Sequence, residues 1–178
     1  PLPSRKPVDP HANGNIRKQD EGVELPADLV EPWQRLGHEA QRRESGDGDG
    51  QFNLPWGIAR DRSGNLYVAD WRNDRIQKFT ADGKWEASIG TSGSGIGQLN
   101  RPNGLAVDAD GDIYVADWMN NRVQVFDKAG KFLTMWGTKG SGNGQFGNAH
   151  GIFVDKKTGW VYVADTANNR IQVFKPAG

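Results

Sequence analysis

One stretch of this sequence occurs three times at a fixed spacing. Gly57, Gly104 and Gly151 hold the same place in the three copies and lie 47 residues apart. Each copy contains the core Tyr-Val-Ala-Asp, two variable residues, then Asn-x-Arg-x-Gln-x-Phe. A repeat with a period in the forties and several short strands is typical of propeller blades. The cores are residues 67–79, 114–126 and 162–174, the third displaced by one residue inserted near Gly159.

The middle copy predicts four short strands. Val, Ile, Tyr, Phe and Trp concentrate in four runs, as in a packed β-sheet. Residues that tolerate tight turns separate the runs: Asp110-Gly111, Met119 to Asn121, and Ala129-Gly130. The third copy has no fourth run. The pattern predicts an antiparallel meander with strands at Leu105–Asp108, Ile113–Ala116, Val123–Phe126 and Phe132–Trp136.

The strands are expected to differ in their surroundings. The first strand should line the axis, where glycines allow the backbones of neighbouring copies to approach closely. The second and third strands are apolar on both sides and should be buried between neighbours. The fourth strand should form the outer edge, since it carries Lys84, Glu86 and Lys131.

The repeated core resembles the NHL repeat, and the resemblance covers residues 51–178. It implies an all-β fold, an NHL-type β-propeller with three four-stranded blades at 51–97, 98–144 and 145–178. Propellers have about 4–8 blades, so three blades cannot close a ring. We expect half of a six-bladed ring, completed by another chain or by missing blades. A homodimer is the favoured single form, because one twofold axis would cover both open faces.

The residues before the first blade form two segments. Residues 1–22 are rich in proline and poor in apolar residues, so we expect an extended arm or linker. Residues 23–50 are expected to hold a fourth strand near Trp33, a charged insertion and a linker; a helix that carries Trp33 is the alternative. We expect Val30–Leu36 to pair beside Ile171–Phe174 of some chain, since that strand edge is otherwise open.

Composition limits the classes of function. Lys and Arg number 22, Asp and Glu number 22, and the formal net charge is zero, which argues against a dedicated polyanion binder. Residues 51–178 carry a slight excess, with 15 basic and 12 acidic residues. Cysteine is absent, which excludes disulfides and thiolate metal sites. No run of about 18 apolar residues occurs, so we expect no membrane insertion.

Polar residues that recur in every copy are expected to be structural, since a site seldom needs one group three times around an axis. In each copy an Asp ends the second strand and an Arg begins the third. The Asp would cap turn amides and the Arg would pair with a neighbouring carboxylate at the blade corner. These residues are Asp70, Arg75, Asp117, Arg122, Asp165 and Arg170.

No metal and no cofactor is expected. The segment Asp108–Asp112 resembles the start of a calcium loop but lacks the distal bidentate Glu, so we interpret it as a hairpin turn. The amidating lyases that share this propeller place zinc-binding histidines around the axis. Of the three equivalent axial positions here, only His150 is a histidine, and Trp56 and Asn103 cannot complete a zinc site.

Positions that differ between matched copies are the candidates for a site. Such positions precede the first strand and follow the Asp at the second turn, and a meander brings both to one side. Aromatic residues with Arg and Asn are typical of recognition surfaces. The alternative is that the Trp rings plug the channel mouth or cover the seams between blades. The expected binding face contains Trp56, Trp71, Arg72, Arg101, Asn103, Trp118, Met119 and His150.

The sequence favours a non-catalytic binding or assembly module that mediates protein–protein interaction or scaffolding through this face. The expected partners are a protein ligand on the loop face and another chain that completes the propeller. One alternative is part of a propeller enzyme, amidating-lyase-like or lactonase-like, with its site residues on absent blades. The other is an RNA-binding NHL propeller, which the balanced charge does not favour.

Overall fold

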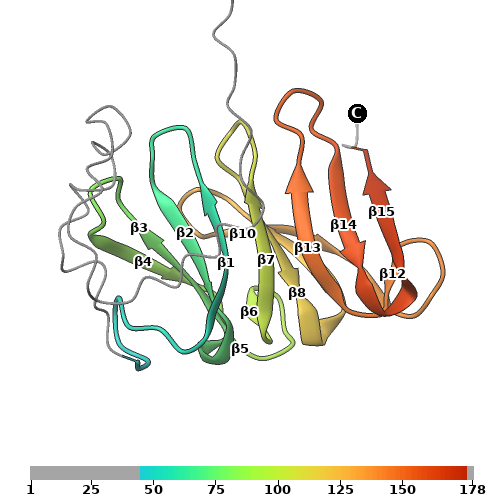
Figure 1. Ribbon diagram of the computed structural model, residues 1–178, viewed down its shortest axis with the longest axis horizontal. Helices are drawn as coiled ribbons and strands as arrows, with labels where there is room; N and C mark the ends of the chain where they lie inside the picture. Colours follow the sequence, from blue (N-terminus) through green and yellow to red (C-terminus); the bar gives the residue numbers. More distant parts are fainter. Residues whose placement is uncertain (1–44, 176–178) are drawn as a thin grey trace, which may run out of the picture.

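The computed structural model describes residues 45–175 and consists of sheets arranged side by side (Figure 1). Two sheets have four antiparallel strands and one has three, in the order of the sequence. The all-β propeller architecture predicted from the repeat is confirmed. The strands are β1 (Pro55–Arg60), β2 (Leu66–Asp70), β3 (Arg75–Phe79) and β4 (Trp85–Ile89); β7 (Pro102–Val107), β8 (Ile113–Asp117), β9 (Arg122–Phe126) and β10 (Phe132–Trp136); and β13 (Ala149–Val154), β14 (Val161–Asp165) and β15 (Arg170–Phe174).

The glycine-rich linkers between the sheets contain short parallel ribbons, which the sequence did not predict. β5 (Thr91–Ser92) pairs with β6 (Gln98–Leu99), and β11 (Thr138–Lys139) pairs with β12 (Gln145–Phe146). A parallel bridge between Ser45 and Phe52 repeats this pairing ahead of the first sheet. Each linker therefore makes a full loop, so that its two short strands run in the same direction, before the next blade begins.

The turn between the second and third strands of each blade is a single turn of 3-10 helix. These turns are η1 (Trp71–Asn73), η2 (Trp118–Asn120) and η3 (Thr166–Asn168). Each turn ends on a residue in the left-handed region, Asp74 or Asn121 for the first two, with φ of 53° and 52°. Asp and Asn adopt this conformation more readily than most residues.

The first strands of the three blades approach one another closely. β7 lies between β1 and β13 and contacts both. A Cβ atom on Gly57 would overlap the carbonyl oxygen of Asn103, and one on Gly104 would overlap that of His150. Only glycine fits these two places, which agrees with the expected close approach of backbones near the axis.

The core lies between the sheets. One cluster joins the first and second blades and includes Tyr67, Ile76, Leu105 and Phe126; a second joins the second and third blades. The outward faces of the end blades are open within the described range. Ile171 is 61% exposed, whereas its equivalents Ile76 and Val123 are fully buried.

Each blade corner is built around the buried Asp that ends the second strand. Asp70 Oδ1 accepts the backbone N–H of Asn53 at 2.7 Å, and its Oδ2 accepts Arg75 Nε at 2.8 Å. The same oxygen also accepts the side-chain amides of Asn73 and Gln77. The pattern recurs with Asp117 and Arg122 at 2.7 Å and with Asp165 and Arg170 at 2.8 Å.

The same corner holds the linker ribbon. Arg122 Nη2 donates to the carbonyl oxygens of Gly95 and Gln98, each at 2.8 Å. The Gln124 side chain accepts the N–H of Gly97 at 3.0 Å. Sequence reasoning overlooked this glutamine and its equivalents Gln77 and Gln172, although they hold one place in the repeated core.

Asp108–Asp112 forms the predicted hairpin turn. Asp108 Oδ1 accepts the backbone N–H groups of Asp110, Gly111 and Asp112 at 2.9–3.0 Å. Across residues 45–175 no group of three His, Asp or Glu side chains could hold a metal ion, and no helix is long and apolar enough to cross a membrane. The arm at 1–22, the Trp33 strand and its pairing with Ile171–Phe174 concern residues outside the described range.

Candidate ligand-binding face

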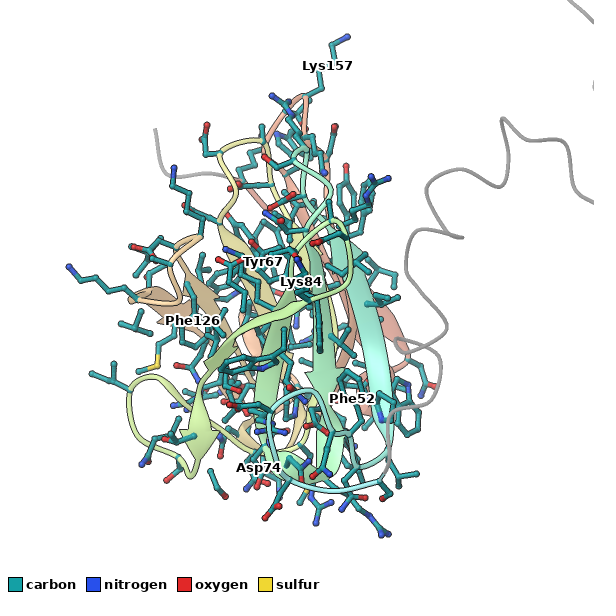
Figure 2. The ribbon with its side chains drawn as sticks, turned by 90° about the vertical axis from the view of Figure 1, so that its left-hand side faces the viewer. Phe52, Tyr67, Asp74, Lys84, Phe126 and Lys157 are labelled. Atoms are coloured by element: carbon teal, nitrogen blue, oxygen red, sulfur yellow. The ribbon has the colours of Figure 1, made fainter. Side chains whose placement is uncertain are left out.

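The 3-10 turns and the linkers meet at one end of the sheets. The N–H of Arg72 in η1 donates to the carbonyl of Asn53 in the preceding linker, at 3.0 Å. Figure 2 shows Asp74, which ends η1, at this end, and Lys157 of the β13–β14 hairpin at the opposite end. Most of the predicted face residues therefore belong to elements that converge at the Asp74 end.

Four aromatic side chains form a closed circuit of contacts at this end. Trp71 stacks on Trp118 with a centroid distance of 5.8 Å and an interplanar angle of 28°. Trp56 contacts Trp71 at 5.9 Å, and His150 contacts Trp118 edge-on at 5.5 Å. His150 also lies edge-on to Trp56 at 6.4 Å, which closes the circuit. Residues from all three blades thus form one continuous aromatic surface.

Arg101 extends this surface. Its guanidinium carbon lies 4.4 Å from the centroid of the Trp71 ring, within the range of a cation–π contact. Its backbone is left-handed, with φ of 55°, and its N–H donates to Asp74 Oδ1 at 2.7 Å. Asp74 on the first blade therefore places the residue that opens the second blade. We call Trp56, Trp71, Arg101, Trp118 and His150 the Trp–Arg cluster.

The cluster is partly open to solvent and partly closed. Trp56 is 59% exposed, whereas Trp71, Trp118, Arg101 and His150 are half-buried. Three buried donors of the cluster have no hydrogen-bond partner among residues 45–175: Trp71 Nε1, Trp118 Nε1 and Arg101 Nη1. The indole N–H groups of Trp85 and Trp136, outside the cluster, also have none. A buried donor without an acceptor is energetically unfavourable, so an acceptor from a ligand would relieve it.

The remaining predicted face residues do not join the cluster. Asn103 is only 4% exposed, so its side chain is not offered at the surface as expected. Arg72 and Met119 are exposed, and Arg72 forms no ion pair with another residue of 45–175. The third blade has Thr166-Ala167 where the first two blades have Trp71-Arg72 and Trp118-Met119. Thr166 and Ala167 are both exposed. The aromatic surface is therefore asymmetric.

Comparison with protein families identifies the repeat. Residues 52–79 match the NHL repeat, and residues 107–176 match DUF5128, described as a six-bladed β-propeller. The chain is 47% identical over 38 residues to Protein wech of Drosophila melanogaster and 48% identical over 40 residues to Protein lin-41 of Caenorhabditis elegans. These matches cover 21% and 22% of this chain but only 5% and 4% of the two relatives.

Solved structures share the architecture at low identity. A streptogramin B lyase matches with 18% identity and a TM-score of 0.54, over 70% of this chain and 38% of that one. A nidogen–laminin complex matches with 21% identity and a TM-score of 0.57, over 70% and 45%. The hydrazine synthase of Kuenenia stuttgartiensis matches with 16% identity and a TM-score of 0.56, over 76% and 36%. This level of likeness shows the fold alone.

Proposed function

This chain is an NHL-repeat β-propeller, and we propose that it acts as a non-catalytic binding module that holds a protein segment on the Trp–Arg cluster. The observation that carries the proposal is the continuous surface of four aromatic rings and one guanidinium, contributed by three blades. Large aromatic residues and Arg are the residue types that dominate binding energy in protein interfaces. Trp56 is the expected anchor, because most of its ring is exposed.

The two alternative functions have weaker support than a protein ligand. An RNA-binding surface of the stacking type needs several free ring faces, but Trp71 is covered by Arg101 and Trp118, which leaves Trp56 as the most exposed ring of the cluster. The enzyme alternative is supported by the streptogramin B lyase, a structural neighbour that shares only 18% sequence identity with this chain. Among residues 45–175 we find no group of side chains that supports RNA binding or catalysis as the Trp–Arg cluster supports a protein ligand.

The test begins with a random-peptide display library selected on the immobilised protein. Affinities of the selected peptides are then measured by calorimetry for the unmodified chain and for two variants. Trp56→Ala should weaken binding by about thirty-fold, corresponding to ~2 kcal/mol for a tryptophan anchor. Trp160→Ala is the matched control, because Trp160 lies in the same hairpin as Lys157 at the opposite end (Figure 2).

Selected peptides that bind Trp56→Ala as tightly as the unmodified chain would contradict the proposal. Binding of a single-stranded RNA oligonucleotide that is lost in Trp56→Ala, with no peptide enriched, would favour the RNA alternative. Steep weakening of that binding with added salt would strengthen the same conclusion.

We propose further that a second copy of the chain completes the ring. A repeated contact between blades supports this: Asp74 Oδ1 accepts the N–H of Arg101, and Asn121 Oδ1 accepts the N–H of Asn148 at 3.1 Å. The equivalent acceptor on the third blade is Asn169, and the equivalent donor on the first blade is Leu54, which is also left-handed with φ of 52°. Across residues 45–175 neither has such a partner, so Asn169 of one copy and Leu54 of another are complementary.

A further inference from the structure

We propose that the Arg101 side of the Trp–Arg cluster is a carboxylate subsite that receives an acidic side chain of the bound protein segment. This inference rests on the proposed function and adds the chemistry of the ligand. Its basis is the buried, unpaired Nη1 of Arg101, the one arginine donor of this kind among residues 45–175, together with the unpaired indole N–H groups of the two rings next to it. Arg101 contacts Trp71, and Trp71 contacts Trp118.

The environment of Arg101 differs from that of the structural arginines. Arg75, Arg122 and Arg170 each pair with the carboxylate of their own blade corner. Arg101 has no ion pair among the described residues. A half-buried guanidinium with no acidic partner is the unusual feature of this end of the molecule.

The acidic residue closest in the hydrogen-bond network is already engaged. Asp74 Oδ1 accepts the backbone N–H of Arg101 at 2.7 Å, and Asp74 Oδ2 accepts the hydroxyl of Ser92 at 2.7 Å. Asp74 therefore fixes the backbone of Arg101 without neutralising its side chain. The Trp71 ring positions the guanidinium, which no carboxylate among residues 45–175 neutralises.

The donor set selects an anion over a cation. An indole N–H can only donate, and a guanidinium offers five donors and no acceptor. A cationic ligand would meet the charge of Arg101, which already occupies a face of the Trp71 ring. A carboxylate fits this set because the planar guanidinium binds its two oxygens side by side.

The surroundings indicate which residue accompanies the carboxylate. Trp56 and Met119 are 59% and 51% exposed and provide apolar surface at the same end of the sheets. A large apolar residue next to the acidic residue would contact this surface while the carboxylate reaches Arg101. A short segment with Glu or Asp beside Phe or Leu therefore matches the subsite. A protein ligand is favoured over a nucleic acid because Arg101 and Trp118 cover the Trp71 ring, which is then not free to stack on a base.

Nuclear magnetic resonance of the indole N–H groups tests the subsite directly. The chain has seven tryptophans, and Trp71→Phe and Trp118→Phe variants assign the two resonances. The probes are a matched pair of capped tripeptides, acetyl-Phe-Glu-Ala-amide and acetyl-Phe-Gln-Ala-amide. We expect the Glu peptide to move both indole resonances and to bind about tenfold more tightly than the Gln peptide.

Substitution of Arg101 separates the subsite from general binding. Arg101→Gln should remove the preference for the Glu peptide, and Arg101→Lys should retain only part of it, because Lys keeps the charge without the planar fork. Arg62→Gln is the control, since Arg62 is an exposed arginine in the β1–β2 hairpin. The backbone bond between Arg101 and Asp74 does not use the substituted side chain, so thermal unfolding should confirm that the variants fold.

The outcomes distinguish failure of the subsite from failure of the proposed function. Equal binding of the two peptides, both lost in Trp56→Ala, would overturn the carboxylate subsite and leave the binding face intact. Absence of any indole shift with either peptide at millimolar concentration would overturn the subsite, and the library selection would then decide the function. Shifts with inorganic phosphate or an RNA oligonucleotide, dependent on Arg101 and absent with the Glu peptide, would overturn the protein carboxylate in favour of phosphate.

Discussion

At the scale of single residues, the buried Asp at each blade corner shows how one carboxylate organises its surroundings. Burial alone would raise the pKa of Asp165. Hydrogen bonds from Asn168, Arg170, the Gly147 N–H and Gln172 outweigh burial and hold this pKa below the ordinary value of 3.8. Because the folded-state pKa is lower than the unfolded one, the ionised Asp165 stabilises the fold above the unfolded pKa. That contribution is lost as the pH falls through the folded pKa.

Asp165→Asn should therefore reduce stability most at neutral pH. We expect the free energy of unfolding to fall by about 2–3 kcal/mol at pH 7, at the low end for a buried pair because the Arg170 side chain is 28% exposed. The difference between the variant and the unmodified chain should shrink as the pH falls below about 4. Urea unfolding at several pH values measures it, and a difference independent of pH would show that the charge is not involved.

The tryptophans of the cluster should differ in their effect on stability. From the sequence alone, Trp71→Ala and Trp118→Ala are expected to leave the melting temperature nearly unchanged. The structure changes this expectation, because both rings are half-buried and stack on each other. We now expect Trp71→Ala to lower stability by about 1–2 kcal/mol and Trp56→Ala by much less. Thermal unfolding measures both; a larger loss for Trp56→Ala would mean that its ring is structural.

At the scale of elements, the unit of this fold is a blade together with the linker that precedes it. The linker ribbon of β5 and β6 is held by side chains of β9, which lies 24–28 residues later in the sequence. Gln124 is fully buried and bonds the linker and Asp117, which it contacts at 3.0 Å. Gln124 thus joins the linker between the first and second blades to β9, the third strand of the second blade.

Gln124→Leu keeps the approximate size of the side chain and removes its polar atoms. It should leave the Gly97 N–H without its acceptor and should reduce stability by about 2–3 kcal/mol. Gln172→Leu is the matched variant on the third blade and should cost less, because Gln172 is only half-buried. Urea unfolding gives the stabilities, and faster hydrogen exchange at Gly97 would locate the effect. Equal losses in the two variants would show that burial does not decide the contribution.

At the scale of the whole molecule, the outward faces of the first and third blades expose apolar side chains that no other part of residues 45–175 covers. Ile58 on β1 is 63% exposed, whereas Leu105, its equivalent on β7, is 6% exposed. Phe153 and Ile171 of the third blade are each 61% exposed. Contiguous exposed apolar surface is typical of protein interaction sites.

We expect the purified chain to associate in solution rather than remain a lone monomer. Ile58→Glu and Ile171→Glu should each weaken association, because each buries a charge if two copies meet through these faces. Leu133→Glu is the control, since Leu133 is 45% exposed but lies on the outer strand β10. Light scattering gives the mass, and a well-folded monomer of the unmodified chain at micromolar concentration would contradict the proposed pairing of copies.

The sequence by itself determined the blade. Runs of β-branched and aromatic residues, turn residues and a 47-residue period are local signals, so the strands of the blades, the turns near Gly111 and Gly130, and the all-β class could all be predicted. The four strands of the second blade lie within a few residues of their predicted positions. Local propensity and periodicity are enough for this, because each strand pairs with its neighbour in sequence.

Only the tertiary structure decided how the candidate site is assembled. The stacking of Arg101 on Trp71 joins residues 30 positions apart on two blades, and the circuit through His150 spans three. The sequence placed Asn103 on the exposed face, yet the packing of β1, β7 and β13 buries it. Contacts between blades depend on how the sheets are inclined to one another, and no pattern within a single repeat encodes that angle. The repeat therefore determines the blade, and the packing of one blade on the next determines which side chains a ligand can reach.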